Sequence, residues 1–405
     1  MDAPGHFDID GMRPRHVERP TSFDAVASIL AEAAASGTAI APLGGAGALH
    51  IGNPIERYGV ALDMRGLDRI LEHQAADLVL SVEAGVCLSD ISKALARHGQ
   101  WLPIEAPDPD RATIGGLIAT ALSGPGRLGH GSLRDYLIGI SVATPTGGLA
   151  KAGGMVVKNV SGFDLMRLHH GALGTLGVIL SANFKVLPAP RGQASVSVRL
   201  AAVDDAKPAL DAARGSGQQP SAVEVLGGVL GTTLTARFDG LPRQVEGIAA
   251  KLTEAIGGEA SVLVEDESRA WWRTAVDQLA LPFAGVVELR LGARPTDVMR
   301  LAADLEELVH SHDISTELLK IWPGLGSIIV RLDSSDARGA AGVDSVINLA
   351  EAKGVTWRMI SAPPDLKSGR DVWGTAPASM ETMRRLKEQF DPGRVLNPGR
   401  FCGLI

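Results

Sequence analysis

The sequence predicts an α+β fold in two domains, and three observations support this prediction. Over the first 190 residues, strand-like and helix-like segments follow one another through irregular, glycine-rich connections, as in α+β or α/β proteins. From about residue 194, short runs of alternating apolar and polar residues indicate half-buried strands with amphipathic helices between them. Several of the chain's 48 glycines gather in clusters within the first half, where a backbone without side chains can approach a ligand closely.

The first domain is expected over residues 21–190, after a flexible N-terminus at residues 1–20. Residues 21–37 fit a helix, because Thr21 can cap it, with Asp24 three positions later, and Gly37 can end it. Residues 38–45 fit a buried strand that enters the first glycine cluster, and Asn53-Pro54 argues against a helix directly after that cluster. Further strands are predicted over 59–64, 78–86, 136–148 and 176–188, and a helix over 88–99.

The second domain, residues 194–370, is predicted to be an antiparallel, ferredoxin-like sheet with helices on one face. Its expected strands include residues 194–200, 222–226, 233–238, 260–266 and 286–291, and its expected helices include residues 241–256 and 295–312. A C-terminal segment, residues 379–405, has one amphipathic helix and a proline-punctuated end that should dock on the first domain. The sequence shows no internal repeat.

Composition and charge argue against several classes of protein. The formal net charge is -7 and the basic residues are dispersed, so we expect no nucleic-acid partner. No segment is apolar for long enough to span a bilayer, and the N-terminus lacks the apolar core of a signal peptide. We therefore expect a cytoplasmic protein that would meet a membrane only through a partner. Cys87 and Cys402 are too few for an iron–sulfur cluster, so we expect two reduced thiols and no metal site.

The first glycine cluster, "LGGAGALHIG" at residues 43–52, has the composition of a phosphate-binding loop. Consecutive backbone N–H groups in such a turn suit a pyrophosphate. A Rossmann motif needs a third glycine and a following helix, but His50 occupies the third position and Asn53-Pro54 opposes the helix. A simple glycine turn is the alternative for this loop alone. The further clusters "ATIGGLIATALSG" (112–124) and "GALGTLGVI" (171–179) favour ligand binding.

These stretches, with "KNVSGFDLMRLHH" (158–170) and the terminal "FDPGRVLNPGRF" (390–401), resemble the FAD-binding oxidases of the vanillyl-alcohol oxidase and p-cresol methylhydroxylase type. Within that family the chain is most similar to FAD-binding subunits of bacterial glycolate oxidase. The resemblance covers nearly the whole chain and is specific through residue 190 and at the terminus. It implies a two-part FAD-binding domain of the p-cresol methylhydroxylase type, a cap domain, and FAD as cofactor.

The resemblance also implies which residues contact the cofactor. The first loop would wrap the pyrophosphate, the second cluster would lie along and beside the cofactor, and the third would line its adenine end. The terminal motif would approach the flavin, or would simply end a helix and dock the tail. The implied residues are Gly44, Gly45, Ala46, Gly47, Ala48, Thr113, Gly115, Gly116, Ser123, Gly124, Ser132, Gly174, Thr175, Gly177, Ile179, Asn397 and Arg400. Many relatives have a histidine bonded covalently to the flavin where this chain has Ala46, so non-covalent FAD is expected.

The catalytic base is not identified by the sequence. His169 or His170 could take the hydroxyl proton of a 2-hydroxy acid, but both stand where the family motif has packing residues, which favours a structural role. His50 is expected to be an ordinary loop residue rather than a flavin attachment point. His310 and His312 end a helix, and residues two apart do not share a helix face, so a metal pair is not expected.

Three cations near the end of the second domain, Arg358, Lys367 and Arg370, could hold a substrate carboxylate, although dispersed surface cations are the commoner explanation. Catalytic relatives that oxidise 2-hydroxy acids share a histidine- and glycine-rich metal motif and a later Glu-His-Gly stretch. This chain has neither. The departure argues against independent substrate chemistry at this flavin.

We therefore expect an FAD-dependent oxidoreductase subunit of a glycolate oxidase or dehydrogenase complex, in which glycolate, a 2-hydroxy acid, is oxidised to glyoxylate. The flavin would perform the redox step while the protein supplies binding and orientation. Electrons would leave through a second FAD subunit and an iron–sulfur subunit, because a lone chain without iron–sulfur cysteines cannot relay electrons far. Two alternatives stay open. The chain could be a catalytically idle, FAD-loaded scaffold for a catalytic paralogue, or a stand-alone FAD-linked oxidase of another alcohol.

Overall fold

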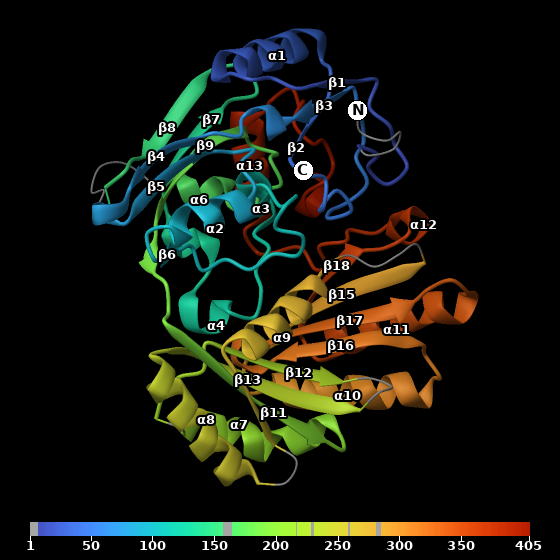
Figure 1. Ribbon diagram of the computed structural model, residues 1–405. Coiled ribbons are helices and arrows are strands. Elements are labelled where there is room, and N and C mark those ends of the chain that lie inside the picture. Colours follow the sequence, from blue (N-terminus) through green and yellow to red (C-terminus); the bar gives the residue numbers. More distant parts are fainter. Residues whose placement is uncertain (1–6, 157–163, 216, 228–230, 258–259, 281–284) are drawn as a thin grey trace. The chain divides into compact units, whose positions relative to one another are not determined.

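The computed structural model describes residues 7–156, 164–215, 217–227, 231–257, 260–280 and 285–405 (Figure 1). The chain divides into two compact units. Unit 1 comprises Met1–Leu122, Ser132–Ala189 and Lys367–Ile405, and unit 2 comprises Ser123–Gly131 and Pro190–Leu366. Helices combine with largely antiparallel sheets in both units, which confirms the α+β prediction.

The described residues of unit 1 form three sheets. A parallel sheet has the order β1-β3-β2, with strands His16–Glu18, Val60–Asp63 and Ile40–Leu43. An antiparallel sheet has the order β4-β5-β9-β7-β8, with strands Ile70–Gln74, Val79–Glu83, Val178–Lys185, Leu137–Ala143 and Leu149–Gly153. The short strands β6 (Gln100–Trp101) and β10 (Leu187–Pro188) form a two-stranded ribbon.

The helices of unit 1 are α1 (Phe23–Ser36), α2 (Leu88–Ala96), α3 (Ile114–Thr120), α5 (Leu133–Tyr136), α6 (Met166–His169) and α13 (Met380–Phe390). Single 3₁₀ turns occur at η1 (Met64–Gly66), η2 (Ala75–Asp77) and η5 (Cys402–Leu404). The cap of α1 is Ser22 rather than the expected Thr21, because the Ser22 hydroxyl accepts the Ala25 N–H at 3.2 Å. Gly37 ends the helix as predicted, with a left-handed φ of 68°. Apolar residues of α2, α3, β5 and β9 share one buried core, which holds α3 against the five-stranded sheet.

Unit 2 is built on one antiparallel sheet in the order β14-β11-β13-β12-β16-β17-β15-β18. Its first half is β11 (Gly192–Leu200), α7 (Ala206–Gly215), β12 (Ala222–Gly227), β13 (Thr232–Gly240), α8 (Pro242–Ile256) and β14 (Ser261–Val264). Its second half is β15 (Val286–Gly292), α10 (Val298–Ser311), β16 (Thr316–Trp322), β17 (Ser327–Asp333), α11 (Ala337–Ala352) and β18 (Thr356–Ser361). Each half is a β-α-β-β-α-β, ferredoxin-like motif, so the structure contains a topological repeat that the sequence does not show.

The remaining elements of unit 2 are α4 (Arg127–His130), α9 (Asp266–Asp277), η3 (Val203–Asp205) and η4 (Pro323–Leu325); α12 (Pro364–Lys367) leads back to unit 1. Helix α9 differs from the prediction that all helices lie on one face. Trp272 of α9 donates through Nε1 to the Ser195 hydroxyl on β11 at 2.9 Å. Ser195 pairs with Arg237 on β13, and Gly240, three residues further along that strand, lies on the opposite face of the sheet because successive residues alternate between faces. Val245 of α8 packs near Gly240, so α8 and α9 cover opposite faces. None of the described helices is long and apolar enough to cross a membrane.

Candidate functional site

Two adjoining cavities lie in unit 1 beside the glycine loop that follows β2. The larger holds about 820 Å³ of empty space and the smaller about 390 Å³, with space open to solvent included. Pro42, Gly44, Thr113, Gly116 and Leu173 border both cavities. The loop after β2, the start of α3 and the turn before β9 therefore enclose one continuous site.

Most of the predicted cofactor residues line these cavities. The larger cavity is bordered by Gly44, Gly45, Ala46, Gly47, Ala48, Thr113, Gly116, Asn397 and Arg400, and the smaller by Gly44, Thr113, Gly115, Gly116, Gly174, Gly177 and Ile179. Residues distant in the sequence are thus brought to one site. Part of the third motif, residues 157–163, lies outside the described residues.

The other predicted residues, Ser123, Gly124, Ser132 and Thr175, line neither cavity. Ser123 and Gly124 begin the segment that clusters with unit 2. Ser132 caps α5, since its N–H and hydroxyl both donate to Asp135 Oδ2 at 2.7 and 2.8 Å. Thr175 is 1% exposed and its hydroxyl donates to the Ala172 carbonyl at 2.7 Å. For Ser132 and Thr175, internal hydrogen bonds give the side chain a structural role.

The first two loop glycines are required by the packing of the protein itself. A Cβ on Gly44 would lie 1.9 Å from Thr113 Oγ1, and one on Gly45 would lie 1.8 Å from the Arg111 carbonyl oxygen. A Cβ on Gly47 would meet nothing within 4 Å. The loop is therefore pressed against residues 111–113 on one side, while Gly47 leaves space on the cavity side.

Four non-glycine residues that border the larger cavity have left-handed backbones. The φ angles are 61° at Ala46, 47° at Asp108, 49° at Leu173 and 44° at Asn397. The backbone of a residue with a Cβ adopts this conformation at a cost in free energy. Such strain persists where the surrounding structure enforces it, often at ligand sites. The clustering of these residues supports a functional role for the cavity.

Two buried polar atoms at the cavity lack partners. Asn397 is 2% exposed, and its Nδ2 donates to the Leu173 carbonyl at 2.6 Å, which fixes the orientation of the amide. Its Oδ1 has no hydrogen-bond partner among the described residues, and neither does Nε of Arg400. A buried polar atom without a partner is costly. A ligand that offers both N–H donors and anionic or carbonyl acceptors, as FAD does, fits this pair.

Arg400 is 4% exposed and belongs to the wall of the larger cavity. Its Nη2 donates to the Ile51 carbonyl at 2.6 Å and to the Leu49 carbonyl. Burial lowers the pKa of Arg400 to about 10, and the nearby Asp10 opposes this shift. The side chain therefore carries a buried positive charge at the end of the glycine loop.

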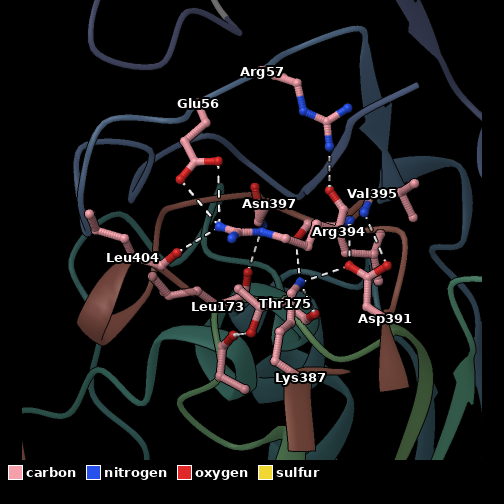
Figure 2. Close-up of polar contacts among 12 residues, drawn as sticks. Glu56, Arg57, Leu173, Thr175, Lys387, Asp391, Arg394, Val395, Asn397 and Leu404 are labelled. Atoms are coloured by element: carbon pink, nitrogen blue, oxygen red, sulfur yellow. Dashed lines mark hydrogen bonds and ion pairs between the residues drawn. The ribbon is translucent and has the colours of Figure 1, made fainter. Parts of the chain in front are cut away.

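A buried ion pair positions the terminal motif that carries Asn397 (Figure 2). Lys387 of α13 donates to Asp391 Oδ2 at 2.7 Å, to the Thr175 carbonyl at 2.8 Å and to the Leu396 carbonyl at 3.0 Å. Asp391 in turn accepts the N–H of Leu396 at 2.9 Å. Burial lowers the pKa of Lys387, and Asp391 opposes that shift. The pair ties α13, the terminal motif and the third glycine cluster together.

Sequence reasoning missed Arg111, which borders the larger cavity and donates from Nη2 to the Gly45 carbonyl at 2.8 Å. Its place directly before "ATIGG" was the available signal. Asp108 also borders the cavity and forms a longer ion pair with Arg111 at 3.7 Å. The glycine loop is thus held from the second cluster by a side chain as well as by backbone packing.

The histidines occupy structural positions. His169 is 5% exposed, burial lowers its pKa to about 4, and it packs behind Gly177, where an added Cβ would lie 3.1 Å from His169 Cε1. His170 borders a separate groove of unit 1. His312 caps the end of α10, with Nδ1 lying 3.1 Å from the Leu308 carbonyl. Neither cofactor cavity has a histidine among its described lining residues.

The three candidate carboxylate-binding cations do not form one site within a unit. Arg358 lies on β18 of unit 2, while Lys367 and Arg370 belong to unit 1. The Lys367 side chain is 0% exposed and pairs with Asp10 at 2.7 Å, so the expectation of a surface cation is wrong for this residue.

Cys87 and Cys402 are free thiols, as predicted. Within the described parts of the chain, no group of three or more His, Cys, Asp or Glu residues is placed to hold a metal ion.

Comparisons with known proteins agree with this geometry. Residues 14–163 match the family described as "FAD binding domain", and residues 374–401 match "FAD linked oxidases, C-terminal domain". A D-lactate dehydrogenase of Anaerostipes hadrus is 27% identical, in an alignment that covers 96% of this chain and 90% of that protein. Glycolate oxidase subunit GlcE of Escherichia coli (strain K12) is 41% identical over 37% of this chain and 42% of its own length.

Solved structures support the fold. Alkyldihydroxyacetonephosphate synthase superposes with a TM-score of 0.69 at 19% identity, covering 94% of this chain and 75% of that one. The two matched segments include the glycine loop, the second glycine cluster, Asn397 and Arg400, which are the parts that meet at the cavities. The chain thus carries one segment similar to FAD-binding domains and one similar to the C-terminal domain of FAD-linked oxidases, and these similarities support FAD as its cofactor.

Proposed function

We propose that this protein is an FAD-dependent oxidoreductase subunit acting on a 2-hydroxy acid, with glycolate as substrate and a multi-subunit complex as its working form. The observation that carries the proposal is the cavity lined by Gly44–Ala48 and Arg400, together with the 41% identity to subunit GlcE over the matched segment. Other relatives are named as a glycolate oxidase subunit and as a D-2-hydroxyglutarate dehydrogenase. Their names share the 2-hydroxy acid as substrate class.

The residues at the cavity have distinct roles in this proposal. Bound FAD would supply the acceptor for the hydride that leaves the hydroxyl-bearing carbon of the substrate. Gly44 to Ala48 would hold its pyrophosphate by backbone N–H groups. The unpaired Asn397 Oδ1 would accept a hydrogen bond from the cofactor, and Arg400 Nε would donate one. The strained backbone at Ala46 and Asn397 would keep these contacts in place before the cofactor binds.

One observation favours a second candidate, the catalytically idle, FAD-loaded scaffold. A base near neutral pH should lie within hydrogen-bond reach of the substrate hydroxyl, yet His169 is buried behind Gly177 and borders neither cofactor cavity. In that case the substrate would be oxidised at a partner's flavin, and this chain would stabilise the complex.

Anaerobic mixing with glycolate separates the two candidates. The FAD-loaded chain is mixed with glycolate alone, then with a second flavoprotein subunit and an iron–sulfur subunit, while flavin absorbance is followed. The leading proposal predicts that the flavin of this chain is bleached in the reconstituted complex. FAD that stays oxidised in this chain while the partner flavin is reduced would reject a redox role and support the scaffold. Bleaching by another alcohol without partners would instead support a stand-alone oxidase.

A further inference from the structure

At the C-terminal end of the glycine loop, four consecutive backbone carbonyls accept hydrogen bonds from two buried cations. Arg400 Nη2 donates to the carbonyls of Leu49 and Ile51, and Lys367 Nζ donates to those of His50 at 2.6 Å and Gly52 at 3.4 Å. The two side chains therefore alternate along residues 49–52. Both cations are almost fully buried in unit 1, at 4% exposure for Arg400 and 1% for Lys367.

The charges of this cluster do not balance. Asp10, whose side chain is 5% exposed, pairs with Lys367 at 2.7 Å. Within the described residues, no carboxylate forms an ion pair with Arg400, although Asp10 acts on it through space. Tyr58 also lies nearby, but burial raises its pKa, so it is neutral at physiological pH. Two cations and one carboxylate leave one formal positive charge in the interior.

A buried charge without a counter-ion is unfavourable, so the excess charge calls for an anion within reach. Arg400 borders the larger cavity together with Gly44 to Leu49, whereas Lys367 does not border it. An anion in this cavity would feel Lys367 through the low-dielectric loop without touching it. Asp10 would oppose that attraction.

We propose that Lys367 and Arg400 form a buried cation pair, only half neutralised by Asp10, whose excess charge stabilises the diphosphate of the cofactor in the adjoining cavity. Lys367 is a positioning and electrostatic residue in this proposal: it orients the loop carbonyls and adds a positive potential at the C-terminal end of the loop. The inference rests on the FAD site assigned above, and it identifies the diphosphate as the part of FAD that the cluster recognises.

The sign of two substitutions separates an electrostatic role from a purely structural one. Lys367→Met removes a positive charge and Asp10→Asn removes a negative one, while both break the same ion pair. A structural role predicts that the two variants weaken ligand binding alike. The electrostatic role predicts opposite effects. The control is Lys207→Met, which makes the same charge change at a side chain 80% exposed in unit 2.

The test uses the full-length chain after removal of FAD, titrated with ADP as the diphosphate probe and with adenosine as the neutral probe. We expect Lys367→Met to weaken ADP binding about tenfold, Asp10→Asn to strengthen it severalfold, and adenosine binding to change in neither. The proposal is overturned if both variants weaken ADP binding to a similar extent, or if neither variant changes the ADP dissociation constant. If Lys367→Met does not fold, Asp10→Asn decides alone, since unchanged or weaker ADP binding contradicts the cluster's role. A wild-type chain that binds neither FAD nor ADP would instead reject the FAD site itself.

Discussion

Substitution of Gly45 by alanine tests how the glycine loop is built. The new Cβ would lie 1.8 Å from the Arg111 carbonyl oxygen, and contacts below 3.0 Å do not occur, so loop and neighbour must separate by roughly 1 Å or more. Such overpacking costs about 1–3 kcal/mol. Displacement would also weaken the 2.8 Å hydrogen bond from Arg111 Nη2 to the Gly45 carbonyl, at a further cost of about 1 kcal/mol.

We therefore expect Gly45→Ala to lower the free energy of unfolding of the FAD-free chain by about 3 kcal/mol. We also expect it to weaken FAD binding, because the displaced loop no longer presents its N–H groups to the pyrophosphate. The assay is fluorescence titration of the FAD-free chain, with urea unfolding as a measure of stability. Gly47→Ala is the matched control, because its Cβ would meet no protein atom within 4 Å and should leave the stability of the FAD-free chain unchanged. A Gly45→Ala protein with wild-type stability and wild-type FAD affinity would refute the packing argument.

Three further predictions follow from the buried groups and from Ala46. Lys387→Met should destabilise the chain by about 3–5 kcal/mol because it leaves Asp391 buried without its cation; a urea midpoint close to wild type would contradict this. His169 is buried neutral, so the stability it contributes is complete above its unfolded pKa near 6.5 and is lost as pH falls toward about 4, by roughly 3 kcal/mol. His169→Gln should flatten this part of the pH profile, and identical profiles for the two proteins would exclude the effect. Acid denaturation should release all FAD into the supernatant because Ala46 offers no attachment atom; flavin that stays with the precipitate would disprove non-covalent binding.

Much of unit 1 could be predicted because its signals are local. Gly37 and the apolar spacing of residues 23–36 define α1, and the glycine clusters identify the loops that meet at the cavities. The prediction of the residue that caps α1 was wrong by one position. Thr21 and Ser22 both carry a suitable hydroxyl, and only the backbone geometry selects Ser22.

The remainder depends on contacts between distant residues. The Lys367–Asp10 pair joins positions 357 residues apart, and the Lys387–Thr175 contact joins positions 212 apart, so neither leaves a local pattern. The repeat in unit 2 is one of strand order and connection, which unrelated side chains can satisfy. The fold class and the loop could therefore be read from the sequence, whereas the charges that support the loop could not.

The position of the cofactor is the most direct test of the account. An experimental structure of the FAD-loaded chain should show the diphosphate against Gly44 to Ala48, a hydrogen bond from the cofactor to Asn397 Oδ1, and one from Arg400 Nε to the cofactor. FAD bound elsewhere on the chain, or bound in this cavity with Asn397 Oδ1 and Arg400 Nε still without partners, would contradict it.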